Sequence, residues 1–127
     1  MRLLSFQRFK WIKQHDSMQC GVACLTMICQ HYGKNYNLEY LDGFCHANIA
    51  GVSMLGISDG AEKMGLKATT VRVSIDEFKD IPMPCILHWN QNHFVVLYKV
   101  KKGKTFYIAD PGKGLIKYTL EEFKKHW

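Results

Sequence analysis

The chain has no apolar run long enough to cross a lipid bilayer. Its longest apolar runs are four or five residues, as in residues 94–98, whereas a membrane-spanning helix needs about 20. The first ten residues also contain no apolar stretch of the length that a secretory signal peptide requires. We therefore expect a domain that crosses no membrane by itself and remains in the cytosol.

Paired cysteines of the metal-binding or redox kind are missing as well. The chain has five cysteines, and no two of them form the C-x-x-C motif of zinc or redox centres. An odd number of cysteines fits reduced thiols, each of which is ordinarily a small buried apolar residue. The sequence thus predicts neither a metal nor another cofactor. The cysteines are Cys20, Cys24, Cys29, Cys45 and Cys85.

Low-complexity stretches and internal repeats are absent too, and the composition is that of an ordinary globular domain. The 127 residues are 47% hydrophobic and 22% charged, which fits one folding unit with one core. A net charge of +6 would suit nucleic acid, an anionic membrane or an acidic peptide. Because the lysines are scattered and no nucleic-acid-binding motif accompanies them, we favour a solvated basic surface and expect no nucleic-acid partner.

Helical patterns fill the N-terminal half. Apolar residues recur at steps of three and four from Cys20 to Tyr32, with Gly33 at the position where a helix would end. Shorter helices are predicted over residues 38–44, capped by Asn37, and over residues 53–64, ending at Gly65.

Strand patterns dominate the C-terminal half. Strands are predicted over residues 68–73, 85–88, 93–100, 105–109 and 115–118. Capping boxes at residues 74–77 and 119–122 predict two short helical segments. Short connections between the later strands favour antiparallel pairing. The fold class is therefore α+β, with a helical N-terminal half and an antiparallel sheet in the C-terminal half.

Cys20 is placed differently from the other cysteines because it begins the first predicted helix. Free backbone N–H groups and the positive end of the helix dipole stabilise a thiolate there. A neighbouring histidine would lower the thiol pKa further. Cys20 is thus the candidate nucleophile.

The predicted hairpin between the strands at 93–100 and 105–109 supplies the partners of Cys20. If Val100 opposes Thr105, Val95 opposes Asp110, and His93 becomes a diagonal neighbour of Asp110. The order Cys, His, Asp is that of a papain-like triad, in which the acid orients the imidazole. We therefore predict His93 as the base and Asp110 as the residue that orients it.

His88 is the competing base, since it would lie opposite His93 across a turn at residues 89–92. It would be one strand farther from Asp110, so His93 is preferred. The other histidines have no such partner and are interpreted as surface or packing residues; they are His15, His31, His46 and His126.

Gln14 lies six residues before Cys20 and offers an uncharged side-chain amide. An oxyanion hole needs donors directed at the developing negative charge. The backbone N–H of Cys20 is one such donor, and we predict Gln14 as the second.

Five segments of the chain together resemble the double-glycine leader peptidases. They are residues 14–25, residues 51–65, His88-Trp89, residues 93–97 and Asp110-Pro111. These peptidases are the N-terminal, papain-like cysteine peptidase domains of peptidase-containing ABC transporters that export bacteriocins. The resemblance implies the same nucleophile, base, acid and oxyanion glutamine as above. One departure is Gln19, because the family usually has an acidic residue just before the nucleophile.

The resemblance implies a cysteine endopeptidase that removes a leader from a precursor peptide after a double-glycine-type motif. Residues 1–127 would form one peptidase domain at the N-terminus of a longer ABC transporter, on the cytoplasmic face of the bacterial plasma membrane. Its partners would be the precursor and the transmembrane and nucleotide-binding domains. Two alternatives are a non-catalytic leader-docking module and a transglutaminase or acyltransferase, in which an amine instead of water attacks the thioester.

Overall fold

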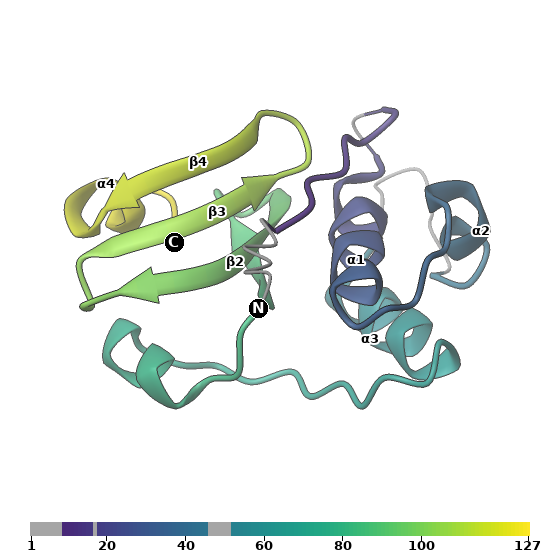
Figure 1. Cartoon of the computed structure of the whole chain (residues 1–127), viewed down its shortest axis with the longest axis horizontal. Coiled ribbons are helices and arrows are strands. Elements are labelled where there is room, and N and C mark those ends of the chain that lie inside the picture. Colours follow the sequence, from purple (N-terminus) through teal and green to yellow (C-terminus); the bar gives the residue numbers. More distant parts are fainter. Residues whose placement is uncertain (1–8, 17, 46–51) are drawn as a thin grey trace, which may run out of the picture.

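A computed structural model describes residues 9–16, 18–45 and 52–127, in which helices and a sheet lie side by side (Figure 1). The helical part contains α1 (Cys20–His31), α2 (Leu38–Asp42) and α3 (Met54–Lys63). The sheet part contains β1 (Cys85–Trp89), β2 (His93–Lys101), β3 (Thr105–Asp110), β4 (Gly114–Thr119) and α4 (Leu120–Lys124). The 3₁₀ helix η1 (Ile75–Asp80) lies between the two parts in sequence. The predicted α+β fold class is confirmed.

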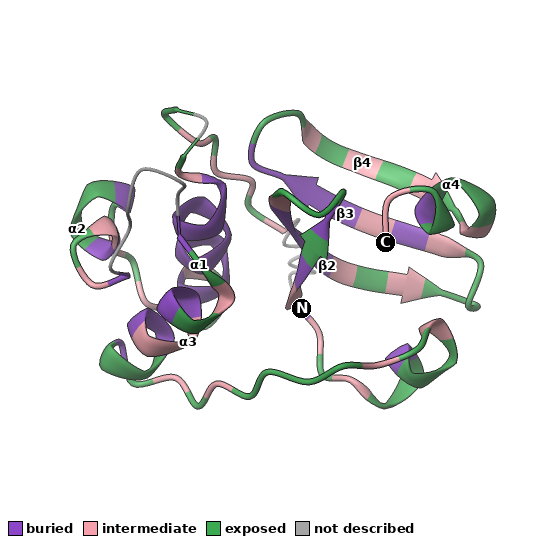
Figure 2. Ribbon diagram, turned by 180° about the vertical axis from the view of Figure 1, so that it is seen from behind, coloured by how far each residue is buried: buried purple, intermediate pink, exposed green. Residues whose placement is uncertain are grey.

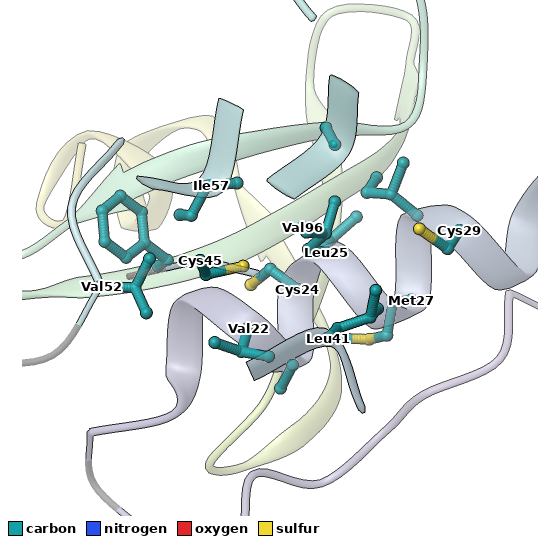
Figure 3. Close-up of a cluster of buried hydrophobic side chains, with 14 of the residues drawn as sticks. Val22, Cys24, Leu25, Met27, Cys29, Leu41, Cys45, Val52, Ile57 and Val96 are labelled. Atoms are coloured by element: carbon teal, nitrogen blue, oxygen red, sulfur yellow. The ribbon is translucent and has the colours of Figure 1, made fainter. Parts of the chain in front are cut away.

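Helix α1 is central because it packs against α2, α3 and β2. Its residues 20–29 are all buried, so the helix is apolar on every side, as expected for a helix enclosed by protein. Figure 3 shows Cys24, Leu25 and Met27 of α1 packed with Leu41 of α2 and Ile57 of α3. This cluster is the first hydrophobic core.

The ends of the short helices follow local signals. The Asn37 side chain accepts a hydrogen bond from the Tyr40 backbone N–H, and the Ser53 side chain accepts one from Gly56. Gly65, with φ +85°, follows α3 in the left-handed region that glycine tolerates best. The predicted helices are confirmed, although α2 ends two residues earlier than expected. In the described part of the chain no helix is long and apolar enough to span a membrane.

The strand predicted over residues 68–73 is wrong. This segment runs along the molecule between α3 and η1 (Figure 1), and among the described residues it joins no sheet. Its alternating residues are exposed or half-buried, and alternation alone does not provide a neighbouring strand. The capping box that follows is confirmed, since Ser74 and Glu77 bond reciprocally at the start of η1.

The four strands form one antiparallel sheet in the order β1-β2-β3-β4. At the β2–β3 hairpin the predicted pairing is wrong by one residue, since Lys101, not Val100, opposes Thr105. A bulge at Tyr98, between Leu97 and Lys99, absorbs one residue, so Val96 opposes Ala109. One further step places Val95 beside Asp110, which is the register predicted for this end of the sheet.

A second hydrophobic core lies under α4, where Phe123 stacks on Phe106 with ring centroids 4.2 Å apart. The capping box at Thr119 and Glu122 starts α4 as predicted. Burial is concentrated along α1 and the middle strands, whereas the outer elements alternate between buried and exposed positions (Figure 2). Strand β2 contributes Phe94 and Val96 to the first core and Val95 and Leu97 to the second, so the sheet lies between the two cores.

Candidate active site

Cys20 is the first residue of α1 and is only 8% exposed. Burial by itself would raise the pKa of its thiol, because a charged thiolate loses solvent. Hydrogen bonds from the His93 side chain and the Phe94 backbone outweigh this effect, assisted by the charge of His93 and the Gly21 backbone. The pKa of Cys20 is therefore below its ordinary value, as a nucleophilic thiol requires.

His93 lies between the thiol and a buried carboxylate. Its Nε2 is 2.8 Å from Oδ1 of Asp110, whose side chain is only 2% exposed. The hydrogen bond to Asp110, followed by the one to Cys20, raises the pKa of His93 to about 9. With Nε2 engaged by the acid, Nδ1 is the ring nitrogen left for Cys20. At neutral pH this arrangement favours an imidazolium beside a thiolate.

Asp110 is held in its ionised form. Burial would raise the pKa of its carboxyl, but the hydrogen bond from His93 and a 2.9 Å bond from the Gly112 backbone N–H bring it below its usual value. The positive charge of Lys113 acts in the same direction. A charged acid at this position keeps His93 protonated and fixes the orientation of its ring.

The other four cysteines are inert by comparison. Burial raises the pKa of Cys24 well above its ordinary value, that of Cys29 and Cys45 to about 11, and that of Cys85 to about 12. Cys20 is buried like Cys24, Cys29 and Cys45, and Cys85 is half-buried, so burial does not distinguish Cys20 from the others. Contact with His93 does.

His88 occupies a different position from the predicted one. Strand β1 extends to Trp89, so Trp89 opposes His93 and His88 opposes Phe94. The tight turn that makes this possible has Asn90 and Gln91 at positive φ. The exposed His88 ring stacks on Phe94 with centroids 5.0 Å apart. The hairpin therefore brings His93, and not His88, to Asp110.

The remaining histidines lie elsewhere. His15 is 3.6 Å from Glu39 at the surface, His31 lies beside Phe9, and His126 bonds Asn90. These three are surface or packing residues, as interpreted from the sequence. His46 lies outside the described residues.

Gln14 lies next to the turn between β3 and β4. Its backbone N–H donates to the Pro111 carbonyl at 3.0 Å, and its Nε2 donates to the Asp16 carbonyl at 3.0 Å. Its Oε1 is buried and has no hydrogen-bond partner within the described residues. A Cβ built on Gly112 would be 3.7 Å from this oxygen, so the amide lies on the same side of the turn as Asp110.

Gln19, the departure from the family pattern, has a structural use. Its Oε1 accepts a 3.1 Å hydrogen bond from the His15 backbone N–H, across the loop that precedes α1. Asp16 closes the same loop by accepting from Met18. An uncharged residue at position 19 therefore holds the loop without placing a negative charge beside the thiolate.

The sequence did not predict three hydrogen bonds at the site. They are the bond of the Phe94 backbone to Cys20, the bond of the Gly112 backbone N–H to Asp110, and the bond of the Trp11 indole to the Asp110 carbonyl. The turn composition Asp-Pro-Gly could have indicated Gly112, because an aspartate often accepts from the N–H two residues on. Backbone donors at Phe94 leave no mark in a sequence.

The geometry agrees with comparisons to known proteins. The chain is 36% identical over 121 residues to the colicin V secretion/processing ATP-binding protein CvaB of Escherichia coli, covering 95% of this chain and 17% of that protein. It is 40% identical over 124 residues to the lactococcin-G-processing and transport ATP-binding protein LagD of Lactococcus lactis subsp. lactis, covering 93% and 18%. The chain thus spans less than a fifth of these relatives.

Solved structures give the same relationship. A double glycine motif protease from an AMS/PCAT transporter, crystallised with its leader peptide, has a TM-score of 0.87 at 37% identity, covering 98% of this chain and 90% of the other. The peptidase domain of Streptococcus ComA has a TM-score of 0.85 at 26% identity, covering 94% and 93%. The model of the Peptidase C39 family matches residues 8–127. With a match over nearly its whole length, this chain belongs to the Peptidase C39 family of cysteine peptidases.

Proposed function

We propose that this domain removes the leader from a precursor peptide by cutting after a double-glycine-type pair, in step with export by an ABC transporter. The observation that carries the proposal is the contact of Cys20 with His93, which in turn bonds Asp110 at 2.8 Å. A lowered thiol pKa beside a raised imidazole pKa suits attack on a peptide carbonyl at neutral pH. The assignment is supported by the two relatives above, whose names combine processing with secretion or transport.

Each catalytic residue has a specific task in this proposal. The Cys20 thiolate attacks the carbonyl carbon, and His93 gives its proton to the leaving amine as the C–N bond breaks. A water molecule then attacks the thioester and gives one proton to His93. The C–S bond breaks, which re-forms the Cys20 thiolate beside the His93 imidazolium, and the carboxylic acid product leaves and loses its own proton to the solvent. Asp110 stays ionised and holds the ring of His93 throughout.

Gln14 and the backbone N–H of Cys20 are the proposed oxyanion donors. The Gln14 amide has two N–H bonds, and only one is needed for the contact with Asp16. The second is free to stabilise the negative charge that develops on the carbonyl oxygen. Its anchoring at Pro111 keeps the amide at the site before substrate arrives.

A groove beside the active site is suited to an apolar leader helix. A cavity of about 1310 Å³ runs between α1 and α3 on one side and residues 65–73 and β1 on the other. Ile57 in its wall lies 3.0 Å from the position of a Cβ built on Gly21, and His88 in the opposite wall stacks on Phe94. Two lining residues of the groove, Ile57 and His88, therefore lie against Gly21 and Phe94, which adjoin Cys20. Apolar docking of an amphipathic helix is a common recognition mode.

We also propose that residues 1–127 form one domain of a longer transporter. The chain covers only 17% and 18% of relatives named for transport and ATP binding. The partners would be transmembrane and nucleotide-binding domains, and the peptidase would lie at the cytoplasmic face of the plasma membrane. Precursors made in the cytosol would meet the active site there before export.

Mass spectrometry of cleavage products tests the function. We expect a precursor with Gly-Gly before the scissile bond to give a free leader acid and a free mature peptide. A matched precursor with Leu in place of the second glycine should resist cleavage, because a narrow cleft excludes the larger side chain. Cleavage of both precursors at equal rates would refute the proposed specificity. A leader amide formed with an added amine would indicate acyl transfer, and binding without turnover would indicate a docking module.

A further inference from the structure

Residues 9–14, which precede the loop before α1, lie against both the helical part and the sheet part of the molecule. The ring of Phe9 stacks on Tyr98 of β2 at 4.8 Å and lies 6.0 Å from His31 at the end of α1. Trp11 and Ile12 are partly buried and pack against the first core. We call residues 9–14 the strap.

Two hydrogen bonds join the strap to the turn that follows β3. The indole Nε1 of Trp11 donates to the Asp110 carbonyl at 2.6 Å, and the Gln14 backbone N–H donates to the Pro111 carbonyl at 3.0 Å. The Asp110 carbonyl also accepts from Lys113 within the turn at 3.0 Å. A carbonyl has two lone pairs, so both donors are accommodated.

The same residue is held through its side chain. Oδ1 of Asp110 accepts from His93 at 2.8 Å and from the Gly112 backbone N–H at 2.9 Å. The Trp11 bond therefore fixes the backbone of the residue whose carboxylate orients the base. Three residues later the strap supplies Gln14, on the same side of that turn.

We propose that Trp11 is a positioning residue, whose indole N–H fixes the Asp110 turn relative to the strap and so sets the distance between the triad acid and the Gln14 amide. The inference rests on the proposed function, because it takes Asp110 as the acid and Gln14 as an oxyanion donor. Trp11 touches no reacting atom. Small displacements of catalytic groups are costly in rate, which is why a remote hydrogen bond affects turnover.

The alternative is that Trp11 only fills space beside the first core. Trp11→Phe separates the two roles because it keeps an aromatic ring and removes the donor. We expect kcat to fall about tenfold while KM changes less than about twofold. Tyr107→Phe is the control: it also replaces a polar aromatic side chain by phenylalanine, at a ring that lies beside Lys99 and Lys117 on the sheet, so both constants should stay within about twofold.

The pH profile of Cys20 alkylation gives a second measurement that needs no turnover. Three other titratable groups interact electrostatically with Asp110. The charge of Lys113 favours the ionised carboxylate, and the charge of that carboxylate in turn raises the pKa of Tyr118 and of Cys24. None of them is altered in Trp11→Phe. A loosened Asp110 should weaken its bond to His93, so the alkylation midpoint should move to higher pH than in wild type and Tyr107→Phe.

If the phenylalanine variant is unfolded at the assay temperature, the chain can be made with β-(3-benzothienyl)alanine at position 11, which keeps the bicyclic shape and replaces N–H by sulfur. Wild-type kcat and an unshifted alkylation midpoint in the folded variant would overturn the inference, as would a change in KM alone. Should wild type cleave no precursor, the proposed function fails, and the alkylation midpoint alone decides the role of Trp11.

Discussion

The first turn of α1 brings Cys20 to His93 and Phe94 of β2, and the next turn carries Cys24 in the first hydrophobic core. Cys20 and Cys24 are one turn apart on this helix and both are buried. At Cys20 the contacts with His93 and Phe94 lower the thiol pKa, and at Cys24 burial raises it. Reactivity therefore arises where the two parts of the fold meet, since the helix supplies the thiol and the sheet supplies the groups that activate it.

The largest expected effect tests this contrast directly. Cys20→Ala should reduce leader cleavage by at least about 10⁴-fold, because no other group supplies the nucleophile. Leader binding, measured by calorimetry, should stay within a few fold because the thiol contributes little contact area. Cys24→Ala is the matched control one turn away and should retain cleavage. Turnover by Cys20→Ala comparable to wild type would disprove the nucleophile assignment.

The two histidines beside the β1–β2 turn provide the next test. In His93→Ala both the base and the imidazolium partner are lost, so cleavage should fall about 10³-fold or more and low-pH alkylation of Cys20 should disappear. In His88→Ala, which removes an exposed ring stacked on Phe94, neither should fall by more than about tenfold. Alkylation rates from pH 5 to pH 10 measure both. The reverse result would show that the wrong histidine was assigned.

A smaller loss is expected for the donor on the strap. Gln14→Ala removes one proposed oxyanion donor and should lower kcat by about 10² to 10³ fold, with a smaller change in KM. Gln19→Ala is a useful control, because it removes an amide from the neighbouring loop that bonds His15 instead. Steady-state kinetics on a fluorogenic leader substrate give both constants. An effect of Gln14→Ala on KM alone would make it a binding residue.

Local patterns predicted the helices and their caps, because a capping side chain acts within three residues of its partner. Asn37 and Thr119 bond as predicted, whereas Ser53, predicted as the first helical residue, is the cap of α3. The strand expected at residues 68–73 failed for the opposite reason. A strand requires a neighbouring edge, and alternation in one segment contains no information about whether that edge exists.

The contact between His93 and Asp110 was predicted partly through two features that offset each other. The hairpin pairing was wrong by one residue at Thr105, but the bulge at Tyr98 restored the predicted register beside Asp110. No sequence signal marked the bulge. Trp11 could not be predicted at all, since its bond to Asp110 joins residues 99 positions apart and a single tryptophan is ordinarily interpreted as a core residue.

The pH dependence of cleavage should give the smallest effect and the finest test of the boundary between helix and sheet. Because contacts with His93 and Phe94 lower the pKa of Cys20, the thiolate should be present below the ordinary thiol range. Because bonds to Asp110 and Cys20 raise the pKa of His93 to about 9, the imidazolium should persist up to that pH. Cleavage needs both forms, so kcat/KM should be level across neutral pH and fall about tenfold per unit above pH 9, as His93 loses the proton required by the leaving amine.

Asp110→Asn should remove the main cause of the raised His93 pKa, so the alkaline limb should move to lower pH while the helix-derived stabilisation of Cys20 remains. Measuring kcat/KM from pH 5 to pH 10 in both proteins decides the matter: an alkaline limb that stays in place in Asp110→Asn would show that the sheet acid does not control the protonation of His93.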